Sequence, residues 1–361
     1  MTRVLLTGPK PSGKGGVSVW VGMVLDYLQS NKTDVELDLL DVNRSASLTH
    51  LLPIYKRMWY SVKDYTRVLF YLRAMLRKKK YDVVHISSSG KSGILRDWLF
   101  MKMAKWYNAK VVVHYHCGTI PEQLKNGGIL AFLLRGIAKK SDLIALDEAT
   151  RVALVNEGFK NVHKIGNPYN PIIDSIYSED VPRNDSQILF VGHVVHEKGI
   201  RELLEAITPI KDVTLKCFGP ENKQIKEELN QYIEDHNLGD RVKFHGLQPV
   251  EVIYQEMRGA GLFVLPTYTE GFPFVIVEAM ASGCPIISTP VGAIEEMLTD
   301  KNGLQGYLVP VKDADCLKKN IENYLNNKEE AKNKALNARK KAVEEYSVDA
   351  IMNKLINLWS K

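Results

Sequence analysis

Short runs of apolar residues alternate along the chain with longer stretches in which apolar positions recur every three or four residues. In the first half the runs are RVLLT, YDVVHIS, KVVVHYH and SDLIALD, which begin at Arg3, Tyr81, Lys110 and Ser141. They are too uniformly apolar for strands with one solvent face and are typical of parallel strands covered on both faces. The pattern therefore predicts strand–helix units joined by right-handed crossovers.

The same rhythm starts again after the segment Asn-Pro-Tyr-Asn-Pro at residues 167–171, with the runs QILFVG, TLKCFG, RVKFHG, GLFVLP and PIIST. Two prolines within five residues disfavour both a helix and a central strand, so this segment is the natural domain boundary. A chain of 361 residues is also longer than one core usually holds. We expect an α/β fold of two Rossmann-like domains, residues 1–168 and 169–345, with ligands at the carboxyl ends of the strands.

Composition narrows the class of protein. Apolar residues make up 45% and charged residues 25% of the chain, which excludes fibrous and disordered proteins. The longest candidate for a membrane span, GILAFLLRGIA, is interrupted by Arg135, and the first apolar run is too short for a signal peptide. The cysteines form no CxxC pair and are Cys117, Cys217, Cys284 and Cys316. These features predict a cytoplasmic protein with reduced thiols.

Charge is divided unevenly along the chain. The net charge is +6, but residues 1–170 carry 26 Lys and Arg against 13 Asp and Glu, and the remainder carries 22 against 29. Residues 56–80 alone hold nine basic residues and one acid. Apolar residues recur there every three or four positions, from Met58 to Leu76, which predicts an amphipathic basic helix. Such a helix either packs on its own domain with a solvated face or docks on an anionic membrane.

Three segments carry candidate chemistry, and the first is the glycine-rich turn TGPKPSGKGGVS at residues 7–18. Gly13 and Lys14 continue a match to a P-loop, but Gly15 stands where Ser or Thr would hold magnesium. Two prolines also remove amide donors from the turn. We favour a wide glycine loop whose Gly15 and Gly16 contact a diphosphate over a P-loop ATPase or a turn without a ligand.

The second segment, FVGHVVHEKG at residues 190–199, ends a predicted strand and opens a helix. A lysine on such a loop reaches an anionic leaving group, although Lys198 considered alone is as readily an ordinary solvated charge. His193 and His196 become cations near neutral pH when a phosphate is adjacent. The segment therefore indicates a phosphate-binding loop.

The third segment, TEGFPFVIVEAMASG at residues 269–283, is the most informative. Glu270 follows a strand, Pro273 suits the first position of a helix, and Gly283 suits its C-terminal cap. That helix contains Glu278, and its amino end presents free amides and a positive dipole to a phosphate. The two carboxylates then have another task, because carboxylates accept hydrogen bonds from sugar hydroxyls. One could hold a ribose and the other a hexose.

Glu270 and Glu278, inside EGFPFVIVEAMASGCPIISTPVGAIEEM, resemble the E-x7-E signature of the retaining glycosyltransferases of family 4. The resemblance spans the chain: the Gly15 to Val17 turn matches the family's glycine loop, FVGHVVHEKG its diphosphate-binding segment, and KCFGPE and FHGLQP its nucleotide-contacting turns. It implies the GT-B fold, in which two Rossmann-like domains have parallel sheets facing across a cleft.

In this family the first domain, here residues 1–168, holds the acceptor, and the second, residues 169–345, holds the nucleotide sugar. The resemblance also implies a C-terminal helix at residues 346–361 that crosses back to the first domain. The sequence YSVDAIMNKLINLW near the end of the chain has the composition for it.

The resemblance further implies a role for each candidate. Glu270 contacts the donor sugar and is catalytic, Glu278 holds the ribose hydroxyls, and Lys198 neutralises the departing nucleoside diphosphate. Amides at the start of the helix meet the sugar or phosphates. The complete implied set of donor-binding residues is Gly15, Gly16, His193, Gly219, Leu247, Gly271, Phe272, Phe274 and Glu278.

One position departs from the family's pattern. The family has an arginine five residues before the lysine, and this chain has His193. A neutral imidazole stabilises a leaving group less than a guanidinium does. Either His193 is protonated in the complex or another basic residue substitutes for the arginine.

His116, in VVVHYHCGT, matches the family's histidine at the end of an amino-terminal strand near the reacting sugar, and is the third catalytic candidate. His114 is the alternative. Tyr115 separates the two along a strand, so both point to one side of it. A lone histidine on a strand is more often a hydrogen-bonded structural residue, and the resemblance reverses that expectation for one of them.

The resulting hypothesis is transfer of a hexose-type sugar from a nucleotide sugar to a glycan acceptor, possibly polyprenyl-diphosphate-linked, in cell-surface polysaccharide biosynthesis. We expect retention by same-face attack, which the resemblance implies. With no zinc spacing and no DxD motif, we expect no metal or other cofactor. Residues 56–80 would place the protein on the inner face of the plasma membrane, whereas no nucleic-acid-binding fold accompanies the charge.

Three alternatives remain open. A nucleotide-sugar epimerase shares the GT-B fold and would turn over the sugar nucleotide without an acceptor. A P-loop-like ATPase would hydrolyse ATP with magnesium. A catalytically silent protein would bind the nucleotide and transfer nothing, an alternative that the histidine at position 193 keeps open.

Overall fold

The fold is that of a computed structural model, which describes residues 1–12, 15–43, 54–90 and 93–361. The chain forms two compact units. The first contains Met1–Asn167 together with Ile351–Lys361, and the second contains Pro168–Ala350. The chain leaves the first unit inside the segment Asn-Pro-Tyr-Asn-Pro, in which the two prolines disfavour regular structure.

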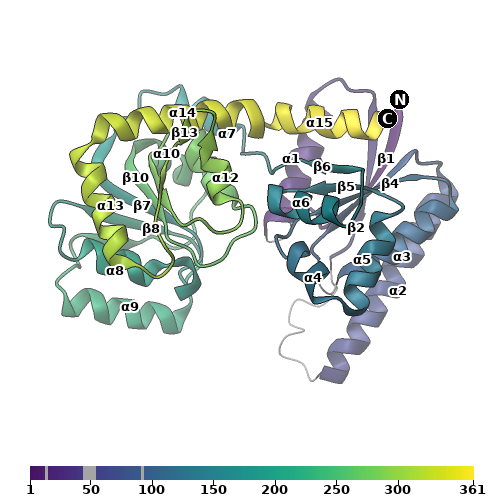
Figure 1. Cartoon of the computed structure of the whole chain (residues 1–361), viewed down its shortest axis with the longest axis horizontal. Helices are drawn as coiled ribbons and strands as arrows, with labels where there is room; N and C mark the ends of the chain where they lie inside the picture. Colours follow the sequence, from purple (N-terminus) through teal and green to yellow (C-terminus); the bar gives the residue numbers. More distant parts are fainter. Residues whose placement is uncertain (13–14, 44–53, 91–92) are drawn as a thin grey trace. The chain divides into compact units, whose positions relative to one another are not determined.

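A six-stranded parallel sheet forms the centre of the first unit (Figure 1). Its strands lie in the order β2-β1-β3-β4-β5-β6. Their bounds are Thr2–Gly8 (β1), Val35–Asp41 (β2), Val83–Ser88 (β3), Lys110–Tyr115 (β4), Asp142–Ala145 (β5) and Val162–Lys164 (β6). β1 pairs with both β2 and β3, with Thr2 opposite Val35 and Val4 opposite Val83. The four apolar runs predicted in this half are β1, β3, β4 and β5.

β2 and β6 were not predicted, and β2 shows why. It is an edge strand with the sequence VELDLLD, and five of its seven residues are partly exposed. Its Glu36 and Asp38 each lie 2.6 Å from Nζ of Lys79, which follows helix α2. The strand is therefore stabilised partly by charge, and its sequence lacks the uniform apolar run that marks the central strands.

Helices cover both faces of this sheet. Their bounds are Gly16–Ser30 (α1), Ile54–Lys78 (α2), Ile94–Trp106 (α3), Ile120–Asn126 (α4), Gly128–Ala138 (α5) and Glu148–Asn156 (α6). Side chains of α2, α3 and α5 share one buried cluster with Val84 and Ile86 of β3. His85 lies between those two residues, so its side chain points to the other face, where it contacts Trp20 of α1.

A second six-stranded parallel sheet forms the centre of the second unit, in the order β14-β11-β10-β7-β8-β9. Its strands are Asn184–Val191 (β7), Thr214–Phe218 (β8), Val242–Phe244 (β9), Ala260–Leu265 (β10), Ile286–Ser288 (β11) and Tyr307–Leu308 (β14). The first five are the five runs predicted from the sequence, and β14 was not predicted. A separate antiparallel pair is formed by Thr299–Asp300 (β12) and Gly303–Leu304 (β13). The predicted α/β class with parallel sheets is confirmed in both units.

Helices of different lengths connect the strands of the second unit. Their bounds are Ile172–Tyr177 (α7), His196–Lys198 (the 3-10 helix η3), Ile200–Ile207 (α8), Lys223–Asp235 (α9), Val250–Gly259 (α10), Phe274–Ala281 (α11), Ile294–Leu298 (α12), Ala314–Asn326 (α13) and Lys328–Tyr346 (α14). Helix α15 (Val348–Ser360) follows Ser347, whose Oγ accepts a hydrogen bond from the Ala350 amide at 3.2 Å.

The C-terminal residues of α15 pack on the first unit, on the face of the sheet that α1 also covers. Trp359 is buried, and its Nε1 donates a hydrogen bond to Nδ1 of His85 at 3.0 Å. Lys110 at the start of β4 donates to the backbone oxygen of Leu358 at 2.7 Å. These contacts assign residues from Ile351 onward to the first unit.

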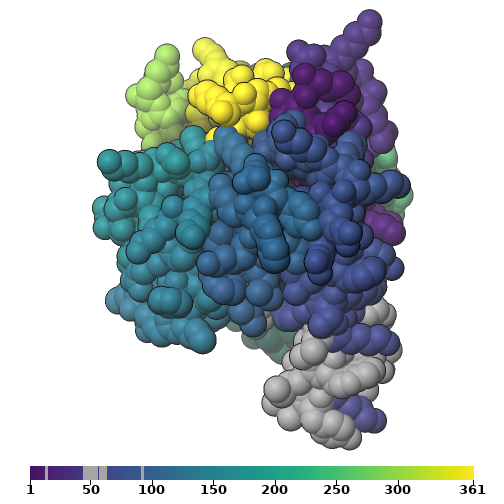
Figure 2. All heavy atoms as spheres, turned by 90° about the vertical axis from the view of Figure 1, so that its right-hand side faces the viewer, coloured from purple at the N-terminus to yellow at the C-terminus, as the bar shows by residue number. Residues whose placement is uncertain are grey.

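Helix α2 is amphipathic, as the sequence predicts. Val68, Leu72 and Leu76 are buried, whereas Phe70 and Tyr71 are 71% and 54% exposed. The side chains at positions 58–60 and 62, which the same prediction includes, lie outside the described residues. Figure 2 shows this side of the first unit, with the blue-violet atoms of α2 at its surface. In the part of the chain that the structure describes, no helix has the length and apolarity to span a membrane.

Candidate functional site

The phosphate-binding loop predicted after β7 packs closely on the end of β10 in the second unit. Gly199, between η3 and α8, has a φ of 73°, and a Cβ at that position would lie 2.0 Å from the backbone oxygen of Pro266. Only glycine permits this approach. The backbone oxygen of Glu197 accepts hydrogen bonds from the Tyr268 amide at 2.8 Å and from Oγ1 of Thr267 at 3.1 Å. The loop that carries Lys198 is thus joined to the segment that carries Glu270.

This packing brings Lys198 and Glu270 together, 72 positions apart in sequence. Nζ of Lys198 donates to Oε1 of Glu270 in a direct ion pair. The two side chains are 25% and 14% exposed, so the pair is shielded yet still reached by solvent. The structure therefore places both predicted catalytic residues of this unit at one point on the carboxyl edge of the sheet.

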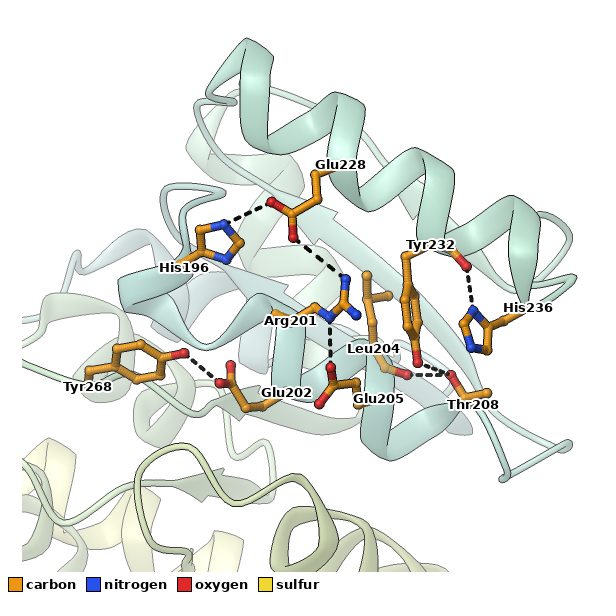
Figure 3. A network of polar contacts seen from close by, with 10 residues as sticks. All are labelled: His196, Arg201, Glu202, Leu204, Glu205, Thr208, Glu228, Tyr232, His236 and Tyr268. Atoms are coloured by element: carbon orange, nitrogen blue, oxygen red, sulfur yellow. Dashed lines mark hydrogen bonds and ion pairs between the residues drawn. The ribbon is translucent and has the colours of Figure 1, made fainter.

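A second layer of polar contacts supports the loop from outside (Figure 3). Nε2 of His196 lies 3.1 Å from a carboxylate oxygen of Glu228 on α9, and Arg201 of α8 lies 3.6 Å from the other oxygen of that carboxylate. On the opposite side the Tyr268 hydroxyl donates to Glu202 of α8 at 2.5 Å. These contacts tie η3 and the segment after β10 to α8 and α9, and they were not predicted.

Helix α11 begins immediately after the Glu270 segment. Pro273 is the residue before the helix and not its first position as predicted, so the first helical amide belongs to Phe274. Gly283 follows Ser282, the C-cap residue of the helix, and has a φ of 64°, the left-handed conformation expected of a glycine at this position. The amides of the first helical turn have no partner inside the helix, so the amino end of α11 offers donors to an anion.

Gly292 packs directly on this segment from the turn after β11. Its φ is 58°, and a Cβ there would lie 2.4 Å from the backbone oxygen of Glu270 and 2.5 Å from that of Gly271. The ring of Phe272 is buried, 5.6 Å from the ring of Tyr346 between centroids. Phe272 therefore anchors the segment with its side chain, and only its backbone is available to a donor.

Glu278 lies on α11 and accepts a hydrogen bond from the Tyr254 hydroxyl of α10 at 2.8 Å. Burial raises the pKa of the Glu278 carboxyl to about 7, against the lowering effect of that hydrogen bond. A carboxyl group that titrates near neutral pH both accepts and donates hydrogen bonds there, as a sugar hydroxyl does. The role expected of Glu278 toward a ribose is consistent with this environment.

Three glycine turns meet at the same edge, after β7, β8 and β9. Gly219 has a φ of 135°, its amide donates to the Gly246 oxygen at 2.9 Å, and a Cβ there would lie 2.1 Å from the Gly192 oxygen. The predicted donor-binding residues His193 and Leu247 each follow one of these glycines. Both are exposed, Leu247 to 74%, so an apolar and a basic side chain stand open to a ligand beside the turns.

The remaining predicted residues belong to the first unit. Gly15 caps α1 with a φ of 110°, and Gly16 is the first residue of that helix. Gly13 and Lys14, which carry the match to a P-loop, lie outside the described residues. Nothing lies within 4 Å of a Cβ built at Gly15, so its backbone conformation, and not close packing, is what favours glycine there.

His116 follows β4 in a cluster of aromatic residues. Its ring lies 3.9 Å from that of His114 and 4.9 Å from that of Trp20, measured between centroids, so the two histidines do share one side as predicted. Burial lowers the pKa of His116 to about 3, and burial together with the neighbouring His116 and His85 lowers the pKa of His114 well below its ordinary value. His114 is fully buried, whereas His116 is only partly so, although its Nε2 is buried and has no hydrogen-bond partner among the described residues.

Two members of the cluster were missed by sequence reasoning. His85 is fully buried with a pKa lowered to about 3 by burial, and Trp359 donates to it from the far end of the chain. The run YDVVHIS resembles VVVHYH in carrying a histidine inside an apolar strand, and that shared feature was the available signal.

Residues 174–341 match the family model "Glycosyl transferases group 1". The matched stretch, somewhat less than half of the chain, is similar to this family. It contains both members of the Lys198–Glu270 pair, together with Glu278 and the three glycine turns. The predicted resemblance to glycosyltransferases is confirmed at this level of classification.

Several relatives carry glycosyltransferase names. The chain is 32% identical over 141 residues to an uncharacterized glycosyltransferase of Methanocaldococcus jannaschii. The aligned region covers 39% of this chain and 38% of the relative. It is 33% identical over 147 residues to the putative teichuronic acid biosynthesis glycosyltransferase TuaC of Bacillus subtilis, which covers 40% and 34%. The matches therefore span little more than a third of these relatives.

Solved structures resemble the whole chain. Sucrose-phosphate synthase from Thermosynechococcus elongatus matches with a TM-score of 0.75 and 20% identity over 100% of this chain and 98% of that structure. Anabaena HepE in complex with UDP matches with a TM-score of 0.71 and 20% identity over 100% of both chains. At this identity the likeness establishes the fold, and the predicted GT-B class is confirmed.

Proposed function

We propose that this protein transfers a hexose-type sugar from a nucleoside diphosphate sugar to a glycan acceptor, with retention, in cell-surface polysaccharide biosynthesis. The observation that carries the proposal is the Lys198–Glu270 pair at the carboxyl edge of the second sheet, beside the amino end of α11. Ligands of open α/β sheets bind at this edge. The name of TuaC supports the biosynthetic role, and UDP bound to HepE supports the nucleotide donor.

The donor is held by three kinds of contact. The amides at the start of α11 and the ammonium of Lys198 bind the diphosphate oxygens, where helix dipole and charge act together. The turns at Gly219 and Leu247 line the base, and Glu278 binds the ribose hydroxyls. Gly15 and Gly16, at the amino end of α1, are further proposed to contact a diphosphate. No divalent ion takes part, because a lysine and a helix terminus supply the positive charge.

In the reaction the bond between the anomeric carbon and the diphosphate oxygen breaks, and an acceptor hydroxyl oxygen bonds to the same face of that carbon. The acceptor proton passes to the departing phosphate. A diphosphate competes with Glu270 for Lys198, so donor binding turns the ammonium toward the leaving group and leaves Glu270 to accept a hydrogen bond from a sugar hydroxyl. His116 contacts the same sugar as a neutral imidazole.

His193 takes the place of the arginine expected in this family. It is exposed on the loop before Lys198, where a phosphate of the donor can reach its ring. We propose that His193 binds the leaving group as an imidazolium. His193→Arg then raises the transfer rate at alkaline pH, where an imidazole is neutral, and leaves it little changed at pH 6.

The donor is identified by a thermal-shift panel of UDP-, GDP- and ADP-sugars, because a ligand that binds only the native state raises its unfolding temperature. Transfer is then measured with that donor and a polyprenyl-diphosphate-linked glycan. Glu270→Gln should abolish transfer and leave the unfolding temperature close to that of the parent protein. A fully active Glu270→Gln variant contradicts the mechanism, and turnover of the sugar nucleotide without an acceptor identifies an epimerase instead.

We further propose that α2 brings the first unit to an anionic membrane where a lipid-linked acceptor resides. Its exposed Phe70 and Tyr71 suit the interface, and the basic residues around them attract anionic lipid at about 1 kcal/mol each. Flotation with phosphatidylglycerol vesicles tests this. Arg73→Glu with Arg77→Glu should weaken flotation, as should added salt, whereas Lys301→Glu on the second unit should not. If flotation is not sensitive to salt, the membrane proposal is wrong, whereas the proposal of sugar transfer is unaffected.

A further inference from the structure

A cavity lies at the amino edge of the sheet in the second unit, opposite the carboxyl edge at which Lys198 and Glu270 lie. It has a volume of about 320 Å³ and is bounded by the start of β7, the turn before β11 and the first turns of α14. Among its lining residues are Tyr177, Arg183, Arg258, Tyr324, Lys332 and Leu336. The cavity therefore combines aromatic and apolar walls with several cations.

The charges in this cavity do not balance. Four cations and two carboxylates line it, and Nζ of Lys328 lies 3.4 Å from Asp185. That pair leaves Arg183, Arg258 and Lys332 against one carboxylate. Within the described residues neither arginine forms an ion pair, although Arg183 donates to the Gly283 backbone oxygen at 2.7 Å.

Arg258 shows the imbalance most clearly. Its guanidinium carbon lies 4.6 Å from the ring centroid of Tyr177, while its Nε is buried and has no acceptor within hydrogen-bond distance among the described residues. A buried charged donor without an acceptor is costly, so the arrangement points to an acceptor that the chain itself does not supply.

The aromatic platform under Arg258 is fixed separately. Arg339 stacks on Tyr177 with its guanidinium carbon 3.5 Å from the ring centroid, and it is paired with Asp174 at 3.0 Å. Arg339 is thus satisfied, whereas Arg258 and Arg183 are not. Both of the latter also act on the buried thiol of Cys284: burial raises its pKa to about 11, and the two guanidinium charges oppose that rise. The two unpaired charges therefore converge on one wall of the cavity.

We propose that this cavity binds a phosphorylated small molecule, whose phosphate lies between Arg183 and Arg258 with Lys332 at the entrance. Planar guanidinium groups match the oxygens of a phosphate with two parallel hydrogen bonds each. The volume falls at the lower end of small-molecule sites and exceeds what a phosphate alone fills. The remaining space, between Tyr177 and Leu336, receives the organic part of the ligand. Because it lies at the opposite edge of the sheet from Lys198, this site is independent of the donor site.

The proposal is tested with inorganic pyrophosphate and the full chain, by isothermal titration calorimetry. Lys198→Gln is included in every protein so that binding at the donor edge does not contribute. Arg183→Gln and Arg258→Gln should each weaken pyrophosphate binding about tenfold or more, because each removes charge-assisted hydrogen bonds. Lys332→Gln, at an exposed position, should weaken it less. The matched control is Lys223→Gln, which removes one exposed charge from α9.

Unchanged affinity in the Arg183 and Arg258 variants overturns the proposal, as does equal weakening in the control. A purely structural role for the arginines predicts a lower unfolding temperature without ligand and an undiminished rise on adding pyrophosphate, which also overturns it. If the arginine variants fail to fold, Lys332→Gln and Arg258→Lys carry the test, since Arg258→Lys keeps the charge and loses the paired hydrogen bonds. The affinity for orthophosphate is then compared with the affinities for glucose 1-phosphate and a nucleoside monophosphate. If neither ester binds more tightly than orthophosphate, the proposal that the cavity also binds the organic part of the ligand is contradicted.

Discussion

The buried carboxyl of Glu278 predicts that stability depends on pH in an unusual direction. Its pKa rises from an ordinary value of 4.5 to about 7 in the folded protein, chiefly through burial. The folded state therefore holds a proton that the unfolded chain releases between these two values, so the stabilising contribution of Glu278 is complete below pH 4.5 and is lost as pH rises through about 7. The free energy of unfolding falls by about 1.4 kcal/mol for each pH unit in that interval, and by about 3 kcal/mol over the whole interval.

Glu278→Gln removes this titration and keeps the shape of the side chain. The assay is urea unfolding of both proteins from pH 4 to pH 8, and the quantity compared is the difference in their free energies of unfolding, which cancels the titration of all other groups. The parent protein should lose stability relative to Glu278→Gln by about 3 kcal/mol across this range, with most of the loss between pH 4.5 and 7. In Tyr254→Phe the loss should extend to higher pH, because the Tyr254 hydrogen bond lowers the pKa of Glu278.

The control is Glu234→Gln on the exposed surface of α9, for which the corresponding difference should stay flat. A flat difference for Glu278→Gln as well, or a parent protein that gains stability with rising pH relative to the variant, refutes the reasoning from burial. Donor affinity supplies an independent check: a ribose held by the carboxylate of Glu278 predicts tighter binding above pH 7 than below it.

Three further predictions concern other parts of the chain. Gly199→Ala should lower the free energy of unfolding by about 3 kcal/mol or more, measured in urea, because a Cβ there meets the Pro266 oxygen at 2.0 Å and the φ is left-handed; an unchanged value would show that the loop after β7 relaxes away. Trp359→Phe should cost about 1 to 3 kcal/mol by leaving His85 without its donor, and His85→Phe in the same protein should recover part of that loss. Sugar transfer should persist in excess EDTA, and complete loss that magnesium restores would contradict neutralisation of the diphosphate by protein side chains and a helix terminus alone.

The central strands and the donor-edge residues were predictable because local sequence determines them. Uniform apolar runs mark the strands buried on both faces, and parallel strands bring their carboxyl ends to one edge, where Lys198 and Glu270 meet. The edge strand β2 was not predictable from apolar runs, because it is stabilised partly by Lys79. The contact of Trp359 with His85 joins positions 274 apart, and neither local sequence contains a motif that predicts it.

A positive side chain is paired at the carboxyl edge of the second sheet, whereas two at its amino edge have no ion-pair partner among the described residues. This difference explains why the site at the carboxyl edge was predicted from the sequence and the cavity at the amino edge was not. At the carboxyl edge Lys198 is paired with Glu270, two residues that also stand inside recognisable motifs. At the amino edge Arg183 and Arg258 come from a loop and a helix without any motif, and within the described residues neither has a carboxylate partner. Lys198 therefore has a neutralising partner before any ligand binds, whereas unpaired guanidinium groups beside a buried thiol repel each other unless an anion joins them. An anionic ligand at the amino edge would therefore relieve a repulsion between unpaired charges. The calorimetric comparison of pyrophosphate affinity between Arg258→Gln and Lys223→Gln measures how much Arg258 contributes to binding such a ligand.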